Sequence, residues 1–309
     1  APVNIAVVKY WGKRDTDRYL PTNSSLSGTL DMARLASTTT IHLFPPATAA
    51  DAGADDRFEL DGAAHAVTPR MARVIAEVRQ AAAAHYGAHS AQATGRLAIH
   101  SANNFPTAAG LASSASGYAA LAYALCHLLG LEMSPSEISA IARLGSGSAC
   151  RSLFGGWVRW AMGDPALDHT VEGPRQSIAS PVVDAAHWPQ VQALICVVSA
   201  GMKSVASTRG MQQTVATSAL FAERVRQVPD TMHAMETALV ARDFEAFAQL
   251  TMRESNQFHA TCLDTQPPIH YLVDTSFRII DFVHAFNAHA GEAVVAYTFD
   301  AGPNAVLYF

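Results

Sequence analysis

Residues 106–117, Pro106-Thr107-Ala108-Ala109-Gly110-Leu111-Ala112-Ser113-Ser114-Ala115-Ser116-Gly117, form a run of small side chains that leads directly into a helical pattern. Residues 96–101 before it are typical of a strand, and apolar residues after it recur at helical spacing up to Gly130. Backbone N–H groups at a helix start attract anions, and small side chains let a phosphate approach. The run therefore predicts an anion-binding loop, although tight helix packing would select the same residues. It matches neither the Walker pattern nor Gly-x-Gly-x-x-Gly.

The composition limits the classes of function. Half of the 309 residues are hydrophobic, only 15% are charged, and the formal net charge is −5. A general nucleic-acid binder needs a basic face, so that class is disfavoured. No apolar stretch is long enough to span a membrane, and no signal-peptide pattern is visible. The four cysteines are widely spaced and predict reduced thiols in a cytoplasmic protein.

Mixed strand and helix signals predict an α+β protein. In the first half we expect strands at residues 3–8, 37–44 and 58–60, a helix from Thr68-Pro69 to Gly87, and another from the capping box at residues 134–137 to Gly145. The weak pattern at residues 163–189 predicts a boundary between domains 1–185 and 186–309. The second domain is expected to have a buried strand at 193–198, helices at 212–227, 231–241, 243–260 and 268–290, and strands at 293–299 and 304–309.

The segment Lys9-Tyr10-Trp11-Gly12-Lys13-Arg14 places three cations within six residues of a charge-poor chain. Neighbouring cations repel one another, and an anionic ligand would explain their clustering. An ordinary basic turn is the alternative.

Three further segments could carry chemistry. Residues 145–152 alternate Gly and Ser and end in Arg151, which can hold a carboxylate or phosphate bidentately; a flexible linker is the alternative. Asp300 lies between two apolar strands, where its carboxylate could contact a substrate hydroxyl, although residues 300–304 also suit a plain turn. Residues 203–211 offer hydroxyls and cations, or a simple helix cap.

Together these segments resemble a known family. The run at 106–115 is similar to the phosphate loop of the GHMP small-molecule kinase superfamily. The segments 9–14, 103–117, 145–156 and 297–307, with Thr214–Ser218 and Ser255–Ala260, resemble the mevalonate diphosphate decarboxylase family. The likeness extends over the whole chain, in the same order and spacing.

The resemblance implies a two-domain GHMP-kinase-like α+β fold. Its N-terminal domain would be like domain 2 of ribosomal protein S5, its C-terminal domain would be a ferredoxin-like α/β sandwich, and the active site would lie in the cleft between them. The implied enzyme converts ATP and (R)-5-diphosphomevalonate into isopentenyl diphosphate, ADP, phosphate and CO₂. ATP and Mg²⁺ would be its cofactors, and it would be a homodimer that acts on a small molecule, without nucleic acid or membrane.

The resemblance also implies roles for individual residues. The catalytic residues would be Asp300 at the C3 hydroxyl, Arg151 at the carboxylate and Lys9 near the reacting phosphate. The substrate-binding residues would be Tyr10, Trp11, Lys13, Ser146, Ser148, Arg151 and Ser207. ATP would be bound by Asn104, Ala109, Gly110, Leu111, Ala112, Ser113 and Ser114. The phosphates of ATP would hold Mg²⁺, with Ser114 as a candidate protein ligand.

Two other functions remain open at this stage. A kinase of the same superfamily, of the mevalonate or phosphomevalonate type, would share the phosphate loop. A non-catalytic ligand sensor on the same fold would be expected to have lost Asp300, Lys9 or the serines of the loop, all of which are present.

Overall fold

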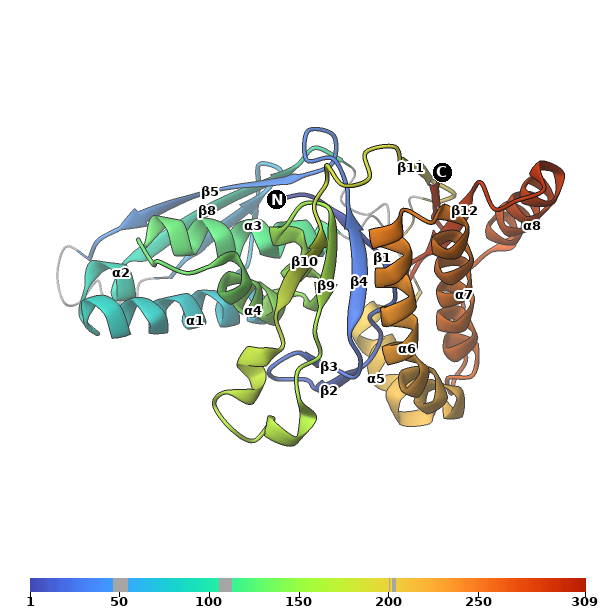
Figure 1. The fold of residues 1–309 in the computed structure, drawn as a ribbon. Coiled ribbons are helices and arrows are strands. Elements are labelled where there is room, and N and C mark those ends of the chain that lie inside the picture. Colours follow the sequence, from blue (N-terminus) through green and yellow to red (C-terminus); the bar gives the residue numbers. More distant parts are fainter. Residues whose placement is uncertain (47–54, 106–112, 200, 202–203) are drawn as a thin grey trace.

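The computed structural model describes residues 1–46, 55–105, 113–199, 201 and 204–309. Two halves lie side by side, with the strands and helices of the first half at the left of Figure 1 and the helices α6, α7 and α8 at the right. No helix in these ranges is long and apolar enough to cross a membrane.

The outer layer of the first half is a four-stranded sheet covered by helices. Its strand order is β5-β8-β6-β7, and α1, α3 and α4 pack against it around one apolar core (Figure 1). The elements of this layer are β5 (Ser37–Phe44), β6 (Arg57–Leu60), β7 (Ala63–His65), α1 (Pro69–Tyr86), α2 (Ala91–Thr94), β8 (Arg96–Asn103), α3 (Ser113–Leu128) and α4 (Pro135–Gly145).

The predicted local signals are confirmed in this layer. Thr68 caps α1 by accepting from the N–H of Met71, and Pro69 is its first residue. Ser134 and Glu137 form the capping box of α4. Asp61 and Gly62 both have positive φ in the turn between β6 and β7, as a two-residue hairpin turn requires.

A second sheet, β1-β4-β9-β10, forms the centre of the molecule. The chain around it comprises β1 (Asn4–Val8), the small hairpin of β2 (Lys13–Asp15) and β3 (Leu20–Pro21), β4 (Ser25–Thr29), β9 (Trp157–Trp160), β10 (Ala179–Val183), and the 3₁₀ helices η2 (Gly147–Leu153), η3 (Pro165–Leu167) and η4 (Gly173–Gln176). All neighbouring strands of this sheet run antiparallel.

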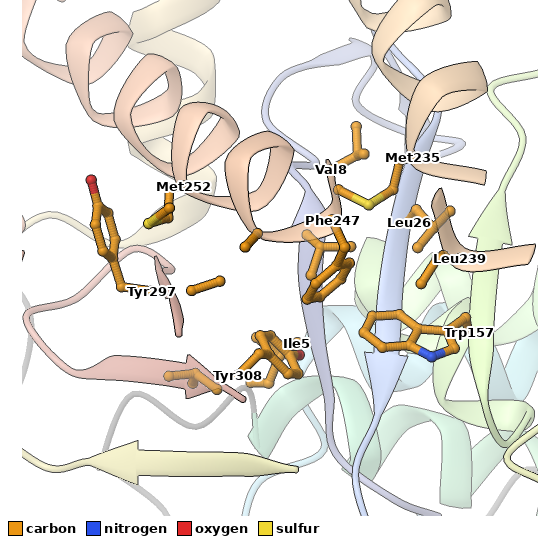
Figure 2. Close-up of a cluster of buried hydrophobic side chains, with 14 of the residues drawn as sticks. Ile5, Val8, Leu26, Trp157, Met235, Leu239, Phe247, Met252, Tyr297 and Tyr308 are labelled. Carbon is orange, nitrogen blue, oxygen red and sulfur yellow. The ribbon is translucent and has the colours of Figure 1, made fainter. Parts of the chain in front are cut away.

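Helices of the second half cover this central sheet. Its elements are β11 (Ala193–Cys196), α5 (Ser207–Thr217), α6 (Ala219–Ala241), α7 (Phe244–Leu263), α8 (Asp274–Ala290), β12 (Ala296–Phe299) and β13 (Ala305–Tyr308), with sheet order β11-β13-β12. Figure 2 shows Ile5, Leu26 and Trp157 of the central sheet facing Met235 and Phe247 of α6 and α7. One continuous core therefore joins the two halves.

Two predictions for the second half are wrong. The sequence predicts a break near Pro229, but α6 runs through it, and the break falls at Ser218, which caps α6. Packing of Val228 and Met232 in the core compensates for the hydrogen bond that a proline cannot donate. The strand predicted as buried, β11, is exposed at Leu194, because it is an edge strand paired only with β13.

We predict that Phe247→Ala lowers the free energy of unfolding by about 3–5 kcal/mol. Phe247 is fully buried, and its ring lies 5.1 Å from that of Trp157 and 5.5 Å from that of Tyr308, so its removal opens a cavity between the halves. Chemical denaturation measures the change. The control is Phe282→Ala on α8, which is 65% exposed and should change the free energy by less than about 0.5 kcal/mol. Equal effects would contradict a shared core.

Candidate active site

Lys9 directly follows β1, and its main chain is held from three sides. Its N–H donates to Glu254 Oε2 of α7 at 2.8 Å. Its carbonyl accepts from Asn23 Nδ2 and from Arg224 NH2 of α6, each at 3.1 Å. With only 2% of its surface exposed, Lys9 is a fixed cation at the junction of the two halves.

Asp300 lies in the turn between β12 and β13 and forms an ion pair with Lys9. Lys9 Nζ donates to Asp300 Oδ1 at 2.6 Å, and the Asp300 side chain stays 36% exposed. Burial lowers the pKa of Lys9, and the neighbouring carboxylates of Asp300 and Glu254 oppose that shift. The exposed part of Asp300 leaves its carboxylate within reach of a ligand.

Arg151 is a buried cation held by neutral groups. It lies in η2 with 1% of its surface exposed, and it donates to Ser27 Oγ at 2.9 Å and Ser25 Oγ at 2.5 Å, both on β4. It forms no salt bridge with any residue that the structure describes. Burial lowers the pKa of Arg151, and the nearby carboxylate of Asp300 opposes that shift. The charge of Arg151 adds to the effect of burial in lowering the pKa of Lys9. A buried guanidinium without a carboxylate partner favours an anionic ligand.

The Gly/Ser segment after α4 meets the first basic segment. A Cβ on Gly147 would lie 2.6 Å from the ring of Tyr10, so only glycine fits there. The Tyr10 ring contacts Trp160 edge-on at 4.7 Å, and burial raises the pKa of its hydroxyl. Ser148 is half-buried, and Ser146 Oγ lies 3.3 Å from Ser114 Oγ at the start of α3. These contacts bring Tyr10 and Ser114 to the segment that holds Ser146 and Ser148.

Lys13 lies in a second cluster of cations. Its Nζ is 3.6 Å from the centre of the Tyr19 ring, and the guanidinium of Arg73 lies 5.8 Å from the same ring. Burial, Arg70 and Arg73 lower the pKa of Lys13 to about 8. Sequence reasoning missed Arg70 and Arg73. For Arg70 the signal was available, because Arg70 lies in the first turn of α1, where the helix dipole disfavours a cation unless it serves another purpose.

The predicted phosphate loop is only partly described. Ala109, Gly110, Leu111 and Ala112 lie outside the described residues, and of Ser113 only its position as the first residue of α3 is known. Ser114 follows it. Asn104 Oδ1 accepts from the N–H of Ala36 at 2.8 Å.

A largely apolar pocket of about 200 Å³ opens beside Ser114. Sequence reasoning did not anticipate it, because its walls come from β5, β6, β8, α1 and α3. Its lining includes Thr39, Phe58, Met71, Ile99, Tyr118 and Leu121. Such a pocket next to a helix N-terminus suits a ligand with a flat apolar part and a phosphate tail.

Two further residues predicted to bind substrate lie against or within α5. Trp11 is 2% exposed, packs on Phe258 at 4.7 Å, and donates from Nε1 to Thr214 Oγ1 at 3.0 Å. It anchors the first basic segment against α5 and α7, and its contact with substrate stays a prediction. Ser207 is the first residue of α5 and is half-buried.

No group of three or more His, Cys, Asp or Glu side chains suitable for a metal occurs in the ranges that the structure covers.

A two-part α+β fold, with a Lys9–Asp300 ion pair and an arginine without a carboxylate partner at its junction, agrees with the class of GHMP-kinase-like proteins, to which the structural neighbours belong. The family model for the mevalonate 5-diphosphate decarboxylase C-terminal domain matches residues 193–309. That for the diphosphomevalonate decarboxylase-like N-terminal domain matches residues 1–171. The chain belongs to the diphosphomevalonate decarboxylase family.

Individual relatives agree with this assignment. Diphosphomevalonate decarboxylase of Rattus norvegicus is 51% identical over the whole chain, which spans 75% of that protein. A crystal structure of mevalonate 5-diphosphate decarboxylase is 49% identical, with a TM-score of 0.89 over 100% of this chain and 77% of that one. A structure described as MDDEF in complex with MVAPP, AMPPCP and magnesium is 33% identical, with a TM-score of 0.84 over 100% of this chain and 86% of that one.

We predict that Thr214→Val destabilises the protein but leaves the KM of both substrates unchanged. Thr214 is fully buried, and its loss leaves the indole N–H of Trp11 without its acceptor, at a cost of about 1–3 kcal/mol. Thermal unfolding and steady-state kinetics measure the two effects. A tenfold rise in KM without loss of stability would instead make Trp11 a substrate contact.

Proposed function

We propose that the site around Lys9, Arg151 and Asp300 carries out the ATP-dependent decarboxylation of (R)-5-diphosphomevalonate. The products are isopentenyl diphosphate, ADP, phosphate and CO₂, as in the mevalonate route to isoprenoids and sterols. The single observation that supports this most is the buried Arg151, a cation without a carboxylate partner, close to the Lys9–Asp300 pair. A carboxylated substrate supplies the missing anion.

The chemistry explains why an Asp, a Lys and an Arg are needed together. The substrate is a 3-hydroxy acid without a β-ketone, so its tertiary hydroxyl must be phosphorylated before CO₂ can leave. Asp300 orients or deprotonates that hydroxyl, a contribution of about 10²–10⁴ in rate. Lys9 stabilises negative charge on the transferring phosphoryl oxygens. Arg151 holds the carboxylate in line for departure, and the C–C electron pair forms the alkene as phosphate leaves C3.

The diphosphate end of the substrate is bound by the second cation cluster. Lys13 and Arg70 attract it, with hydroxyls from Tyr10, Ser146, Ser148 and Ser207. Support comes from the pKa of Lys13, which is lowered first by burial and then by the like charges of Arg70 and Arg73; a bound polyanion would relieve that repulsion.

ATP occupies the pocket beside α3. Its base lies against the apolar lining near Phe58 and Tyr118, and its phosphates are held by Gly110, Ser113 and Ser114 at the helix start. Mg²⁺ neutralises phosphate charge when bound. Because acidic clusters are lacking in the described residues, ATP oxygens hold it, with the Ser114 hydroxyl as the candidate protein ligand.

We also propose a domain division, an oligomeric state and a cellular location for the protein. The domains are 1–185 and 186–309, which is supported by β10 ending the central sheet at Val183 and β11 beginning another at Ala193. The enzyme is a homodimer, which the open edge of β11 and exposed Phe282 on α8 support. It acts in the cytoplasm, in keeping with its free cysteines.

Product analysis tests the proposed reaction. The protein is incubated with ATP, Mg²⁺ and 5-diphosphomevalonate labelled at C1, and ADP, phosphate and CO₂ are followed together. Matched formation of all three is expected. ADP without CO₂ or free phosphate would make the protein a kinase, and bound label without ADP would make it a sensor.

We predict that Asp300→Asn lowers kcat by at least about 100-fold, because the amide cannot accept the hydroxyl proton. Substrate affinity, measured by isothermal titration calorimetry, should change by less than about threefold, since Arg151 and Lys13 are intact. More than half of wild-type turnover would remove Asp300 from the proposed role.

We predict that the KM for 5-diphosphomevalonate is constant below about pH 8 and rises above it. Lys13 must be protonated to attract the diphosphate, and its pKa is about 8, so higher pH removes the charge. The rise should approach tenfold per pH unit at most, roughly the limit for one titrating group. Lys13→Arg keeps the charge and should remove the rise; an unchanged profile in this variant would contradict the assignment.

A further inference from the structure

Two side chains of α7 hold the residue that precedes Asp300. Ser255 Oγ accepts from the N–H of Phe299 at 3.0 Å, and the His259 ring packs edge-on against the Phe299 ring, with the ring centres 6.2 Å apart. Ser255 and His259 are four residues apart, so they lie on the same face of the helix. The N–H of Phe299 is therefore fixed by α7 where β12 leads into Asp300.

The same helix holds the main chain of the other member of the ion pair. Glu254, adjacent to Ser255, accepts from the N–H of Lys9. Glu254 is itself paired with Arg224 at 2.7 Å, and the two side chains are 2% and 3% exposed. Arg224 NH2 also donates to the Lys9 carbonyl. A buried pair with these further bonds has little freedom to move.

His259 is suited to this position in its neutral form. It is 7% exposed, and burial together with the charge of Lys9 lowers its pKa to about 3. Its ring packs edge-on against that of Phe299. The neutral imidazole thus lies beside Phe299 without adding a second positive charge near Lys9.

We propose that Glu254 and Ser255 are positioning residues, which hold Lys9 and Asp300 at ion-pair distance by fixing the main chain on either side of the active site. The proposal rests on the proposed function only for its kinetic consequence. Helix α7 thereby acts as a common support for two groups that lie 291 residues apart in the chain. Tight support matters because a displacement of about 1 Å can cost about 100-fold in rate.

The first test is Ser255→Ala, which removes the acceptor of the Phe299 N–H. We expect kcat to fall by about 10- to 100-fold, with KM for both substrates within about threefold. Thr261→Val is the control, since the buried hydroxyl of Thr261 lies on the same helix and bonds within α7 in the described structure.

The pH profile provides a readout that simple destabilisation would not move. The charged and titratable groups that face Lys9 are Asp300, Glu254, Arg151 and His259. Asp300 raises the pKa of Lys9, so loosening the pair lets Lys9 lose its proton at a lower pH. The alkaline limb of kcat should therefore move to lower pH in Ser255→Ala, but not in Thr261→Val.

The outcomes separate this proposal from the proposed reaction. A crystal structure of Ser255→Ala should show a Lys9 Nζ–Asp300 Oδ1 distance longer than 2.6 Å, whatever reaction the wild type catalyses. An unchanged distance, or equal kinetic losses in Ser255→Ala and Thr261→Val with an unshifted pH profile, would overturn the proposal. If Ser255→Ala does not fold, Ser255→Cys decides, since a thiol sulfur is only a weak acceptor.

Discussion

The buried pair of Arg224 and Glu254 is the interaction on which the site depends. It lies between α6 and α7, and both of its members bond to the main chain of Lys9 at the end of β1. Burying two charges is unfavourable in itself, and removal of one partner of such a pair costs about 3–5 kcal/mol, because the other is left uncompensated. A pair this costly to disturb fixes the first half of the chain against the helices of the second.

The site keeps a positive charge because the buried Arg151 is hydrogen-bonded by groups that do not neutralise it. Arg151 is satisfied by the hydroxyls of Ser25 and Ser27, which accept its protons but carry no negative charge. Carboxylates in those two places would stabilise the arginine and cancel its attraction for an anion. The chain has a formal net charge of −5, but the neutral acceptors around Arg151 leave this site locally positive.

Local signals in the sequence predicted local structure well. The ends of α1 and α4 are encoded by a few adjacent residues, Thr68-Pro69 and the capping box from Ser134 to Glu137, and these predictions are confirmed. The course of α6 through Pro229 and the exposure of β11 depend on partners distant in the chain, so short-range patterns could not reveal them. The same reason hid Arg70 and the pocket beside Ser114, which form only when α1 meets β2 and α3.

The residues of α7 show where sequence reasoning about a site reaches its limit. Motifs identified Lys9 and Asp300, because groups that touch a ligand stand in short, unusual segments. Ser255 and His259 lie in the segment Ser255–Ala260, which the sequence singled out only by its resemblance to the family, and only the fold shows that they meet Phe299. Ordering a flexible lysine costs up to about 2 kcal/mol in side-chain entropy, and fixing each backbone residue costs about 1–2 kcal/mol. In this fold that entropy is lost on folding, before any ligand arrives, so binding energy remains available for the transition state.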